Sequence, residues 1–375
     1  MMMKGFKIRL LPNQEQEDMM WKHIYGCRFI WNYMLNLQKE RYKNGEKHLS
    51  GFDMCKVLTP LKKLEKYAWL NEISNHSMQL ICQDLAKAYD KFFKKLNNNP
   101  KFKSKKKAKK TYPIRCDAFY FKNSLTQISK LGKVKFQTNY KIPEGKGVKF
   151  YNPRISLVNK KWILSFSMEC ENQTPILTDK SMGIDLGIKE TAVVSFGNES
   201  FVYHNINKSK RVRKLEDKKK HIQRIISRKY CTNGNYEKTQ NIIKYEKILK
   251  EIYYKLSNIR NNYIHQITHK LISLLPKQVI MEDLNISGMM KNRHLSRAIA
   301  EQCLYEFIRQ MRYKCERAGI EFIQVPRFYP SSKTCSECGL IKKDLKLSDR
   351  TFVCECGFKL DRDLNAAKNL EKYIG

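Results

Sequence analysis

Residues 183–189 read GIDLGIK and place a carboxylate inside an expected strand, which the apolar pattern extends over residues 182–196. Side chains alternate between the two faces of a strand, so Asp185 points away from both of its apolar neighbours. Burying a carboxylate is costly unless something pairs with its charge, and a metal ion is one such partner. Gly187 lies on the same face, where its missing side chain would let a phosphodiester backbone approach.

A second acidic segment follows another hydrophobic strand. Residues 279–285 read VIMEDLN, and the apolar part predicts a buried strand that ends in Glu282 and Asp283. These two side chains face opposite ways, so only one of them can share the side of Asp185.

A third acidic segment starts the last expected helix. Residues 360–367 read LDRDLNAA, in which Asp361 is placed to cap the helix and Asp363 can project from its first turn toward the sheet. The two alanines at 366 and 367 permit close packing of that helix.

One aspartate in a strand is more often paired or exposed at an edge than functional. Acids from three separate segments, each beside a buried element, are harder to explain in that way. Three carboxylates can hold two Mg²⁺ ions ~4 Å apart, one activating water and the other stabilising the leaving oxygen. The pattern therefore predicts a two-magnesium site for phosphodiester chemistry.

Four clustered cysteines lie between the second and third acidic segments. They form the pairs Cys335-x2-Cys338 and Cys354-x-Cys356, and a glycine that permits a tight turn follows each pair. Four thiolates suit one tetrahedral Zn²⁺, which is structural because no ligand position stays open. Two disulfides are the alternative, and the second pair lacks the commoner Cys-x-x-Cys spacing.

The composition indicates a polyanionic partner. The 73 Lys and Arg residues against 36 Asp and Glu residues give a formal net charge of +37. Nucleic acid is the favoured partner, because many phosphate contacts release condensed counterions. A basic ribosomal-type protein or a protein of the membrane surface is the alternative.

The sequence lacks a run of ~20 apolar residues that could span a membrane, and its start lacks a secretion signal. We therefore expect a cytoplasmic, bacterial protein, associated with the nucleoid when bound to DNA. In that compartment the 12 cysteines stay reduced.

The remaining pattern predicts a multidomain α+β protein, with a mixed sheet in its second half. Strands are expected at 4–10, 200–203 and 321–325, a set of short strands at 111–173, and helices at 21–42, 54–64, 77–96, 211–275 (broken near Gly234), 296–319 and 363–373.

Residues 101–110 read KFKSKKKAKK and are too charged to enter a core. By default such a run is a solvated linker. With this net charge we favour a segment that contacts phosphates and becomes ordered on binding, through Lys101, Lys103, Lys105, Lys106 and Lys107.

Together the three acidic segments resemble the three RuvC motifs of the TnpB (OrfB) transposon proteins, the relatives of type V CRISPR effector nucleases. Residues 29–32 (FIWN) and 100–106 (PKFKSKK) are also similar to phrases of that family, so the resemblance extends over almost the whole chain. It implies Asp185, Glu282 and Asp363 as the catalytic triad and Mg²⁺ ligands, with Asp361 as the alternative to Asp363 for the third position.

The resemblance also implies the domain organisation. A helical bundle and a small wedge-like β domain precede an RNase H-like RuvC α/β domain with an inserted zinc ribbon. The expected boundaries are 1–11 for the first wedge strand, 12–100 for the helical recognition domain, 101–178 for the basic linker and the rest of the wedge, 179–330 and 358–375 for the two nuclease parts, and 331–357 for the ribbon.

By the same resemblance, the protein binds a guide RNA made from the transposon end. That RNA pairs with double-stranded target DNA, the protein reads a short adjacent motif, and the ribbon binds target nucleic acid. By rough position Gln79 and Gln83 are placed near the motif-reading surface. A monomer is favoured.

Two other functions stay open. One is a nuclease-inactive, RNA-guided DNA-binding regulator, against which the intact acids argue. The other is a RuvC-like transposase or resolvase that uses no guide RNA, and copurification of a structured RNA distinguishes it from the first two.

Overall fold

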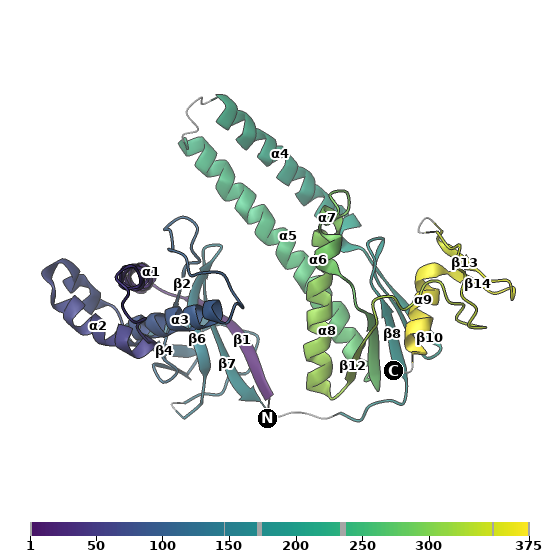
Figure 1. Ribbon diagram of the computed structural model, residues 1–375, viewed down its shortest axis with the longest axis horizontal. Helices are drawn as coiled ribbons and strands as arrows, with labels where there is room; N and C mark the ends of the chain where they lie inside the picture. Colours follow the sequence, from purple (N-terminus) through teal and green to yellow (C-terminus); the bar gives the residue numbers. More distant parts are fainter. Residues whose placement is uncertain (1, 146, 171–174, 233–237, 347–348, 374–375) are drawn as a thin grey trace. The chain divides into compact units, whose positions relative to one another are not determined.

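The computed structural model describes residues 2–145, 147–170, 175–232, 238–346 and 349–373. The chain forms two compact units, unit 1 (Met1–Glu171) and unit 2 (Asn172–Gly375) (Figure 1). No helix in the described part of the chain is long and apolar enough to cross a membrane.

Unit 1 is built on a seven-stranded antiparallel sheet. Its strands are β1 (Met2–Leu11), β2 (Thr111–Pro113), β3 (Phe119–Lys122), β4 (Leu125–Ile128), β5 (Gly132–Gln137), β6 (Tyr151–Val158) and β7 (Lys161–Cys170). They lie in the order β2-β6-β7-β1-β5-β4-β3, so the first strand of the chain lies in the middle of the sheet. In β1 the alternate residues Phe6, Ile8 and Leu10 are buried, as expected of a strand with one covered face.

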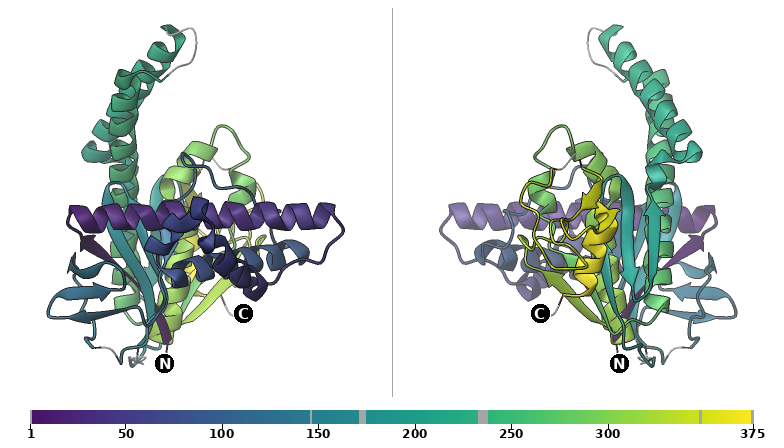
Figure 2. Two further views of the ribbon diagram at one scale, coloured as in Figure 1. Left: turned by 90° about the vertical axis from the view of Figure 1, so that its left-hand side faces the viewer. Right: turned by 90° about the vertical axis from the view of Figure 1, so that its right-hand side faces the viewer.

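Among the described residues of unit 1, the helical elements are α1 (Gln14–Lys43), α2 (Gly51–Lys63), the 3-10 helix η1 (Glu65–Glu72) and α3 (Asn75–Phe93). A capping box starts α1, which Figure 2 shows lengthwise: the side chain of Asn13 accepts the N–H of Gln16 at 2.8 Å, and the side chain of Gln16 accepts the N–H of Asn13 at 3.1 Å. Helices and sheet share one hydrophobic core.

Unit 2 contains a five-stranded mixed sheet, as the alternation of strands and helices predicted. Its strands are β8 (Ser181–Asp185), β9 (Glu190–Phe196), β10 (Glu199–His204), β11 (Gln278–Glu282) and β12 (Glu321–Val325). The order is β10-β9-β8-β11-β12, in which β8, β11 and β12 run parallel and β9 runs antiparallel to both of its neighbours.

The helical elements of unit 2 are η2 (Ile206–Lys208), α4 (Lys210–Thr232), α5 (Gln240–Ser273), α6 (Ile286–Met289), α7 (Ser296–Gln302), α8 (Leu304–Ala318) and α9 (Arg362–Glu371). A small hairpin of β13 (Thr351–Val353) and β14 (Lys359–Asp361) precedes α9. In Figure 1, α4 and α5 form a long antiparallel pair.

The sheet of unit 2 is covered on both faces, and Figure 1 shows it between α8 and α9. On β11, Met281 lies in the core with α5 and α8, whereas Ile280 lies in a second core with Leu370 of α9. Because side chains alternate along a strand, Asp185 of β8 and Glu282 of β11 belong to the α9 face.

The structure corrects two expected elements and leaves a third point open. Residues 182–196 form two antiparallel strands instead of one, because the chain turns at 186–189 while apolar residues continue on both sides of the turn. The helix expected at 296–319 is divided at Cys303, whose positive φ of 54° ends α7. The break expected near Gly234 lies outside the described residues.

Candidate functional site

Two acids end neighbouring parallel strands. Ile184 of β8 is paired with Met281 of β11, so the residues that follow them, Asp185 and Glu282, lie side by side at the same edge of the sheet. Asp283 is directed elsewhere and forms an ion pair of 3.0 Å with Arg327. Of the two consecutive acids, Glu282 is therefore the one beside Asp185.

Helix α9 packs directly on β8 because Gly183 has no side chain. A Cβ atom at this position would lie 2.0 Å from the carbonyl oxygen of Ala367 and 2.4 Å from the backbone nitrogen of Glu371. The small residue at 367 was expected to permit close packing, but the glycine that receives it was not identified from the sequence. This contact brings the first turn of α9 to the end of β8.

The two aspartates at the start of α9 are in different environments. Asp361 is the N-cap, and its side chain accepts the N–H groups of Asp363 at 3.0 Å and Leu364 at 3.2 Å. Asp363 is half-buried, with Nη2 of Arg362 3.4 Å from its Oδ1. The carboxylate of Asp361 is thus occupied by hydrogen bonds to the start of the helix, whereas the charge of Asp363 acts on Asp185 of the sheet.

Burial and the charges of the two other acids act on the carboxylate of Asp185. The pKa of Asp185 is raised well above its usual range, first by burial and then by the negative charges of Glu282 and Asp363, against the positive charge of Arg362. A cation among these groups would replace repulsion by attraction. Oxygen donors from three carboxylates suit a hard divalent cation, so the donor set fits magnesium.

The four predicted cysteines lie together in the structure. All their sulfur atoms are within 4.8 Å of one another, with Cys335 and Cys356 3.8 Å apart and Cys338 and Cys354 3.5 Å apart. Gly339 and Gly357 have positive φ angles of 78° and 85°, as the turns after the two pairs require.

The thiol cluster fits a tetrahedral metal ion with sulfur ligands, for which zinc is the common occupant. Although burial acts to raise it, hydrogen bonds from the backbone of Cys338 and Glu337 lower the pKa of Cys335 to about 7, which favours the thiolate. The described residues contain no second group of three or more metal-ligand side chains whose ligand atoms lie this close together. The carboxylate oxygens of the three acids are therefore farther apart than the sulfur atoms.

The first residues of the basic segment 101–110 pack against α1, which was not expected from their charge. Backbone oxygens of Lys101 and Lys103 accept hydrogen bonds from Trp31 at 3.1 Å and Asn32 at 3.0 Å, and Nζ of Lys103 lies 3.4 Å from the centre of the Trp31 ring. Burial lowers the pKa of Lys103 to about 8. The expectation that this run is too charged to enter the packed part of the protein is therefore wrong at Lys103, which packs half-buried against α1. The three predicted lysines at 105–107 are exposed.

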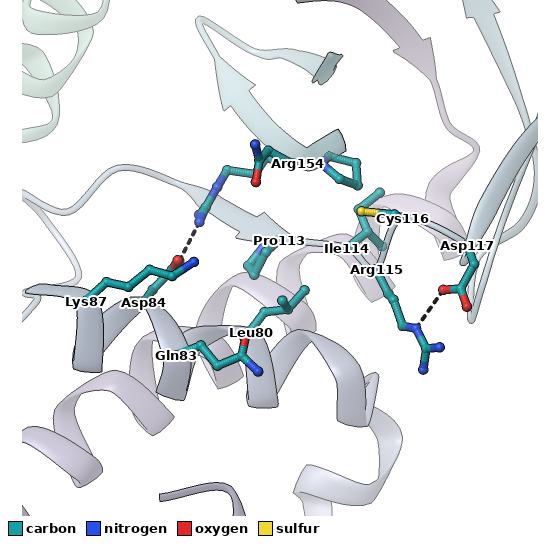
Figure 3. Close-up of a pocket in the computed structure, with 12 residues that line it drawn as sticks. Leu80, Gln83, Asp84, Lys87, Pro113, Ile114, Arg115, Cys116, Asp117 and Arg154 are labelled. Atoms are coloured by element: carbon teal, nitrogen blue, oxygen red, sulfur yellow. Dashed lines mark hydrogen bonds and ion pairs between the residues drawn. The ribbon is translucent and has the colours of Figure 1, made fainter. Parts of the chain in front are cut away.

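The two predicted glutamines lie one turn apart on α3, and both are half-buried. Gln83 lines a hollow of about 440 Å³, which Figure 3 shows between α3 and the segments that carry Arg115 and Arg154. Gln79 is not among the residues that line it, and its carbonyl oxygen accepts a hydrogen bond from Cys55 at 3.7 Å. The sequence did not indicate these arginines, because Arg115, which follows β2, and Arg154, on β6, are distant from α3 along the chain.

Family models match three parts of the chain. A model described as "Helix-turn-helix domain" of the OrfB type matches residues 1–47, and one described as "Probable transposase", also of the OrfB type, matches residues 165–293. A third, described as "Cas12f1-like, TNB domain", matches residues 305–370, which include the four cysteines.

Curated relatives extend over nearly the whole chain. A "Putative RNA-guided DNA endonuclease" of Streptomyces pristinaespiralis is 27% identical over 373 residues, covering 98% of this chain and 88% of the relative. The "Putative RNA-guided DNA endonuclease InsQ" of Escherichia coli (strain K12) is 29% identical over 388 residues, covering 98% and 91%.

Among solved structures, the fold is similar to the protein in "Cryo-EM structure of the Cas12f1-sgRNA-target DNA complex". The TM-score is 0.61 at 13% sequence identity, and the match covers 99% of both chains. At this identity the likeness concerns the fold.

Proposed function

Because the chain belongs to the TnpB (OrfB) family, we propose that it is an RNA-guided DNA endonuclease of a transposable element, with Asp185, Glu282 and Asp363 as its cleavage site. The two curated relatives that cover 98% of the chain carry the name of this activity. The protein is accordingly an enzyme that hydrolyses phosphodiester bonds of DNA and works with a guide RNA.

The observation that carries the assignment of the cleavage site is the convergence of three acids on the α9 face of the mixed sheet. Two of them end the parallel strands β8 and β11, and the third comes from the first turn of α9. The strand order β10-β9-β8-β11-β12, in which β9 alone runs opposite to the other four strands of the sheet, supports an RNase H-like RuvC domain.

Two Mg²⁺ ions, when bound, would activate a water molecule and stabilise the leaving oxygen of the scissile phosphate. The chain supplies the carboxylates of Asp185, Glu282 and Asp363 for this purpose, from elements that are fixed by strand pairing and by helix packing. Burial, and then the negative charges of Glu282 and Asp363, raise the pKa of Asp185, so a cation at this point would stabilise its charged form.

The cysteine cluster holds one structural Zn²⁺ in this proposal. Four sulfur donors leave no position for a substrate, so its contribution is to fold residues 335–356 as a ribbon. Lys342 and Lys343 on that ribbon would contact the phosphates of the target.

The proposed partners are guide RNA and target DNA, whose phosphates the positively charged side chains of the protein would bind. In unit 1 the exposed lysines at 105–107 follow a backbone that α1 already fixes, so less ordering is needed when they bind phosphates. Lys101, Lys103, Gln79 and Gln83 are the further candidates for nucleic-acid contact, and of the two glutamines Gln83 is the one that lines the hollow beside Arg115 and Arg154.

The test is expression with the downstream DNA of the element, recovery of any bound RNA, and cleavage of a matched plasmid with Mg²⁺ and with EDTA. We expect guide-dependent and Mg²⁺-dependent cutting that disappears in Asp185→Ala. Asp217→Ala is the matched control, because this aspartate is 74% exposed on α4 and pairs with Lys220.

Two outcomes would point to the other functions. Bound RNA without any cutting would favour the regulator. Cutting that ignores the RNA would favour a transposase or resolvase, to which the description "Probable transposase" of one matching model also points.

A further inference from the structure

The connection from β12 to the first cysteine is attached to the acid cluster at several points. We call residues 326–336 the anchored loop. Nη2 of Arg327 pairs with Asp283 at 3.0 Å, immediately after β11, and the hydroxyl of Tyr329 donates to the carbonyl oxygen of Asn369 at 3.3 Å. The ring of Tyr329 also lies 5.1 Å from that of Tyr373. The loop therefore lies against both β11 and α9.

Within this loop, Ser331 reaches the acid cluster directly. Its side chain is buried, at 2% exposure, and its hydroxyl donates a hydrogen bond to Oε1 of Glu282. In the part of the chain that the structure describes, Oε2 of Glu282 accepts no hydrogen bond. A glutamate has three rotatable side-chain bonds, so fixing one oxygen restricts where the other can lie.

Two buried asparagines of α9 keep this part of the loop in place. Nδ2 of Asn369 donates to the carbonyl oxygens of Ser331 at 2.7 Å and Thr334 at 2.6 Å. Nδ2 of Asn365 donates to the same oxygen of Thr334 at 2.7 Å, while its Oδ1 accepts the N–H of Ser336 at 3.0 Å. Buried amides with these partners are expensive to displace, so the loop is held rigidly on the helix.

The same helix presents the third acid. Asp363 lies two residues before Asn365, so α9 carries one carboxylate of the cluster and, through its asparagines, fixes the serine that contacts another. Cys335, the first thiol of the ribbon, lies in the loop between the two backbone groups that Asn365 holds. The ribbon and the acid cluster thus share one support.

We propose that Ser331 is a positioning residue, which orients the carboxylate of Glu282 for divalent-cation binding and is held in place by Asn365 and Asn369. The inference rests on the proposed function for the role of Glu282. Ser331 acts through Glu282 and need not touch substrate. Partners of metal ligands commonly contribute 10–100-fold to metal affinity or activity.

The test compares Ser331→Ala and Ser331→Thr with the wild type. Mn²⁺ binding to the zinc-loaded protein is measured by electron paramagnetic resonance, with Asp185→Ala defining the signal of the acid site. The Mg²⁺ concentration for half-maximal cleavage is measured with guide RNA present. In Ser331→Ala we expect Mn²⁺ binding weakened about 10–100-fold and the half-maximal Mg²⁺ concentration raised to match. Ser331→Thr, which retains a hydroxyl, should recover most of both.

Ser336→Ala is the matched control. This serine is also buried in the anchored loop, its Oγ has no hydrogen-bond partner among the described residues, and its backbone contacts with α9 do not depend on its hydroxyl. Unchanged melting temperatures would show that all three variants fold.

Mn²⁺ binding by Ser331→Ala that equals that of the wild type would overturn the positioning role and leave the proposed function intact. An equal loss in Ser336→Ala would also overturn it, because the effect would then belong to the loop as a whole. If Asp185→Ala instead bound Mn²⁺ as tightly as the wild type does, the acid site would be refuted, and with it the proposed cleavage centre.

Discussion

The cysteine cluster and the acid cluster of unit 2 are assembled in opposite ways. The four thiols come from one segment, residues 335–356, and lie within 4.8 Å of one another. The three acids come from positions 185, 282 and 363, and they meet only because β8 pairs with β11 and α9 packs on Gly183. One site is local in sequence, whereas the other is a product of the tertiary fold.

Because the two clusters are assembled differently, different substitutions are expected to disrupt them. A local site of soft ligands forms with its own turns, so its loss should be confined to the ribbon and whatever rests on it. A site of distant hard ligands depends on every element that brings the acids together. The anchored loop connects the two sites, because it contains Cys335 and contacts Glu282 through Ser331.

The largest effect is expected from Asp363→Asn, which removes a charge without changing the size of the side chain. DNA cleavage should fall by more than about 100-fold, because even the partners of metal ligands commonly contribute 10–100-fold. The fold should persist, since one of three mutually repelling charges disappears. Single-turnover cleavage and the melting temperature measure both effects.

Asp217→Asn, on the exposed face of α4, is the control for the charge change. Cleavage by Asp363→Asn that stays close to the wild-type rate would mean that convergence of the three acids is not what makes the site.

A smaller loss is expected from Cys354→Ser, which removes one of the four proposed zinc ligands. Without the metal the ribbon should become less ordered. The anchored loop should then hold Glu282 and the first turn of α9 less firmly. We expect cleavage to fall about 10–100-fold, as for loss of an outer support of a metal site. Zinc content by mass spectrometry and amide hydrogen exchange locate the change.

Unit 1 should keep its hydrogen-exchange protection in this variant, and Cys231→Ser, at an exposed thiol outside the cluster, should retain its zinc. Full zinc loss with unchanged cleavage would show that the two clusters are independent.

A still smaller effect on cleavage is expected from Gly183→Ala, which tests the packing that brings the acids together. The added methyl group would lie 2.0 Å from the carbonyl oxygen of Ala367, so α9 must shift. Overpacking of this kind costs about 1–3 kcal/mol, and each kcal/mol lowers the melting temperature by about 2–4 °C in a unit of this size. Cleavage should fall about tenfold, since small displacements of catalytic groups are costly.

Gly5→Ala in β1 is the matched control, because a Cβ atom there would have no neighbour within 4 Å. If both glycine variants melt and cleave as the wild type does, close packing of α9 on β8 is not what aligns Asp363.

Sequence patterns predicted the local features of the molecule well. The strands β11 and β12 were predicted from short apolar segments, and the cysteine cluster was predicted from the spacing of its four members in one segment. The mixed sheet of unit 2 followed from the alternation of strands and helices. In each case the physical cause lies within a short stretch of chain.

What the sequence could not reveal depends on tertiary contacts. The turn at 186–189 is hidden because apolar residues continue on both sides, and the break at Cys303 has no proline or glycine to mark it. Ser331 has no feature that distinguishes it from other loop serines, since its partner Glu282 is far away in sequence. The contact of Lys103 with Trp31 overrides a strongly charged local pattern.

The smallest effect is expected from Asp361, and it separates the role of a helix cap from that of a metal ligand. Asp361→Ala leaves the N–H groups of Asp363 and Leu364 without their acceptor, which costs about 1 kcal/mol. Cleavage should fall by less than about tenfold, the equivalent of 1.4 kcal/mol. Asparagine caps helices as well as aspartate does, so Asp361→Asn should restore both stability and cleavage. Thermal melting and single-turnover cleavage of the two variants measure this. If Asp361→Asn instead lost cleavage as completely as Asp363→Asn, the charge at position 361 would be required. Asp361 would then be a member of the acid cluster and not only a helix cap.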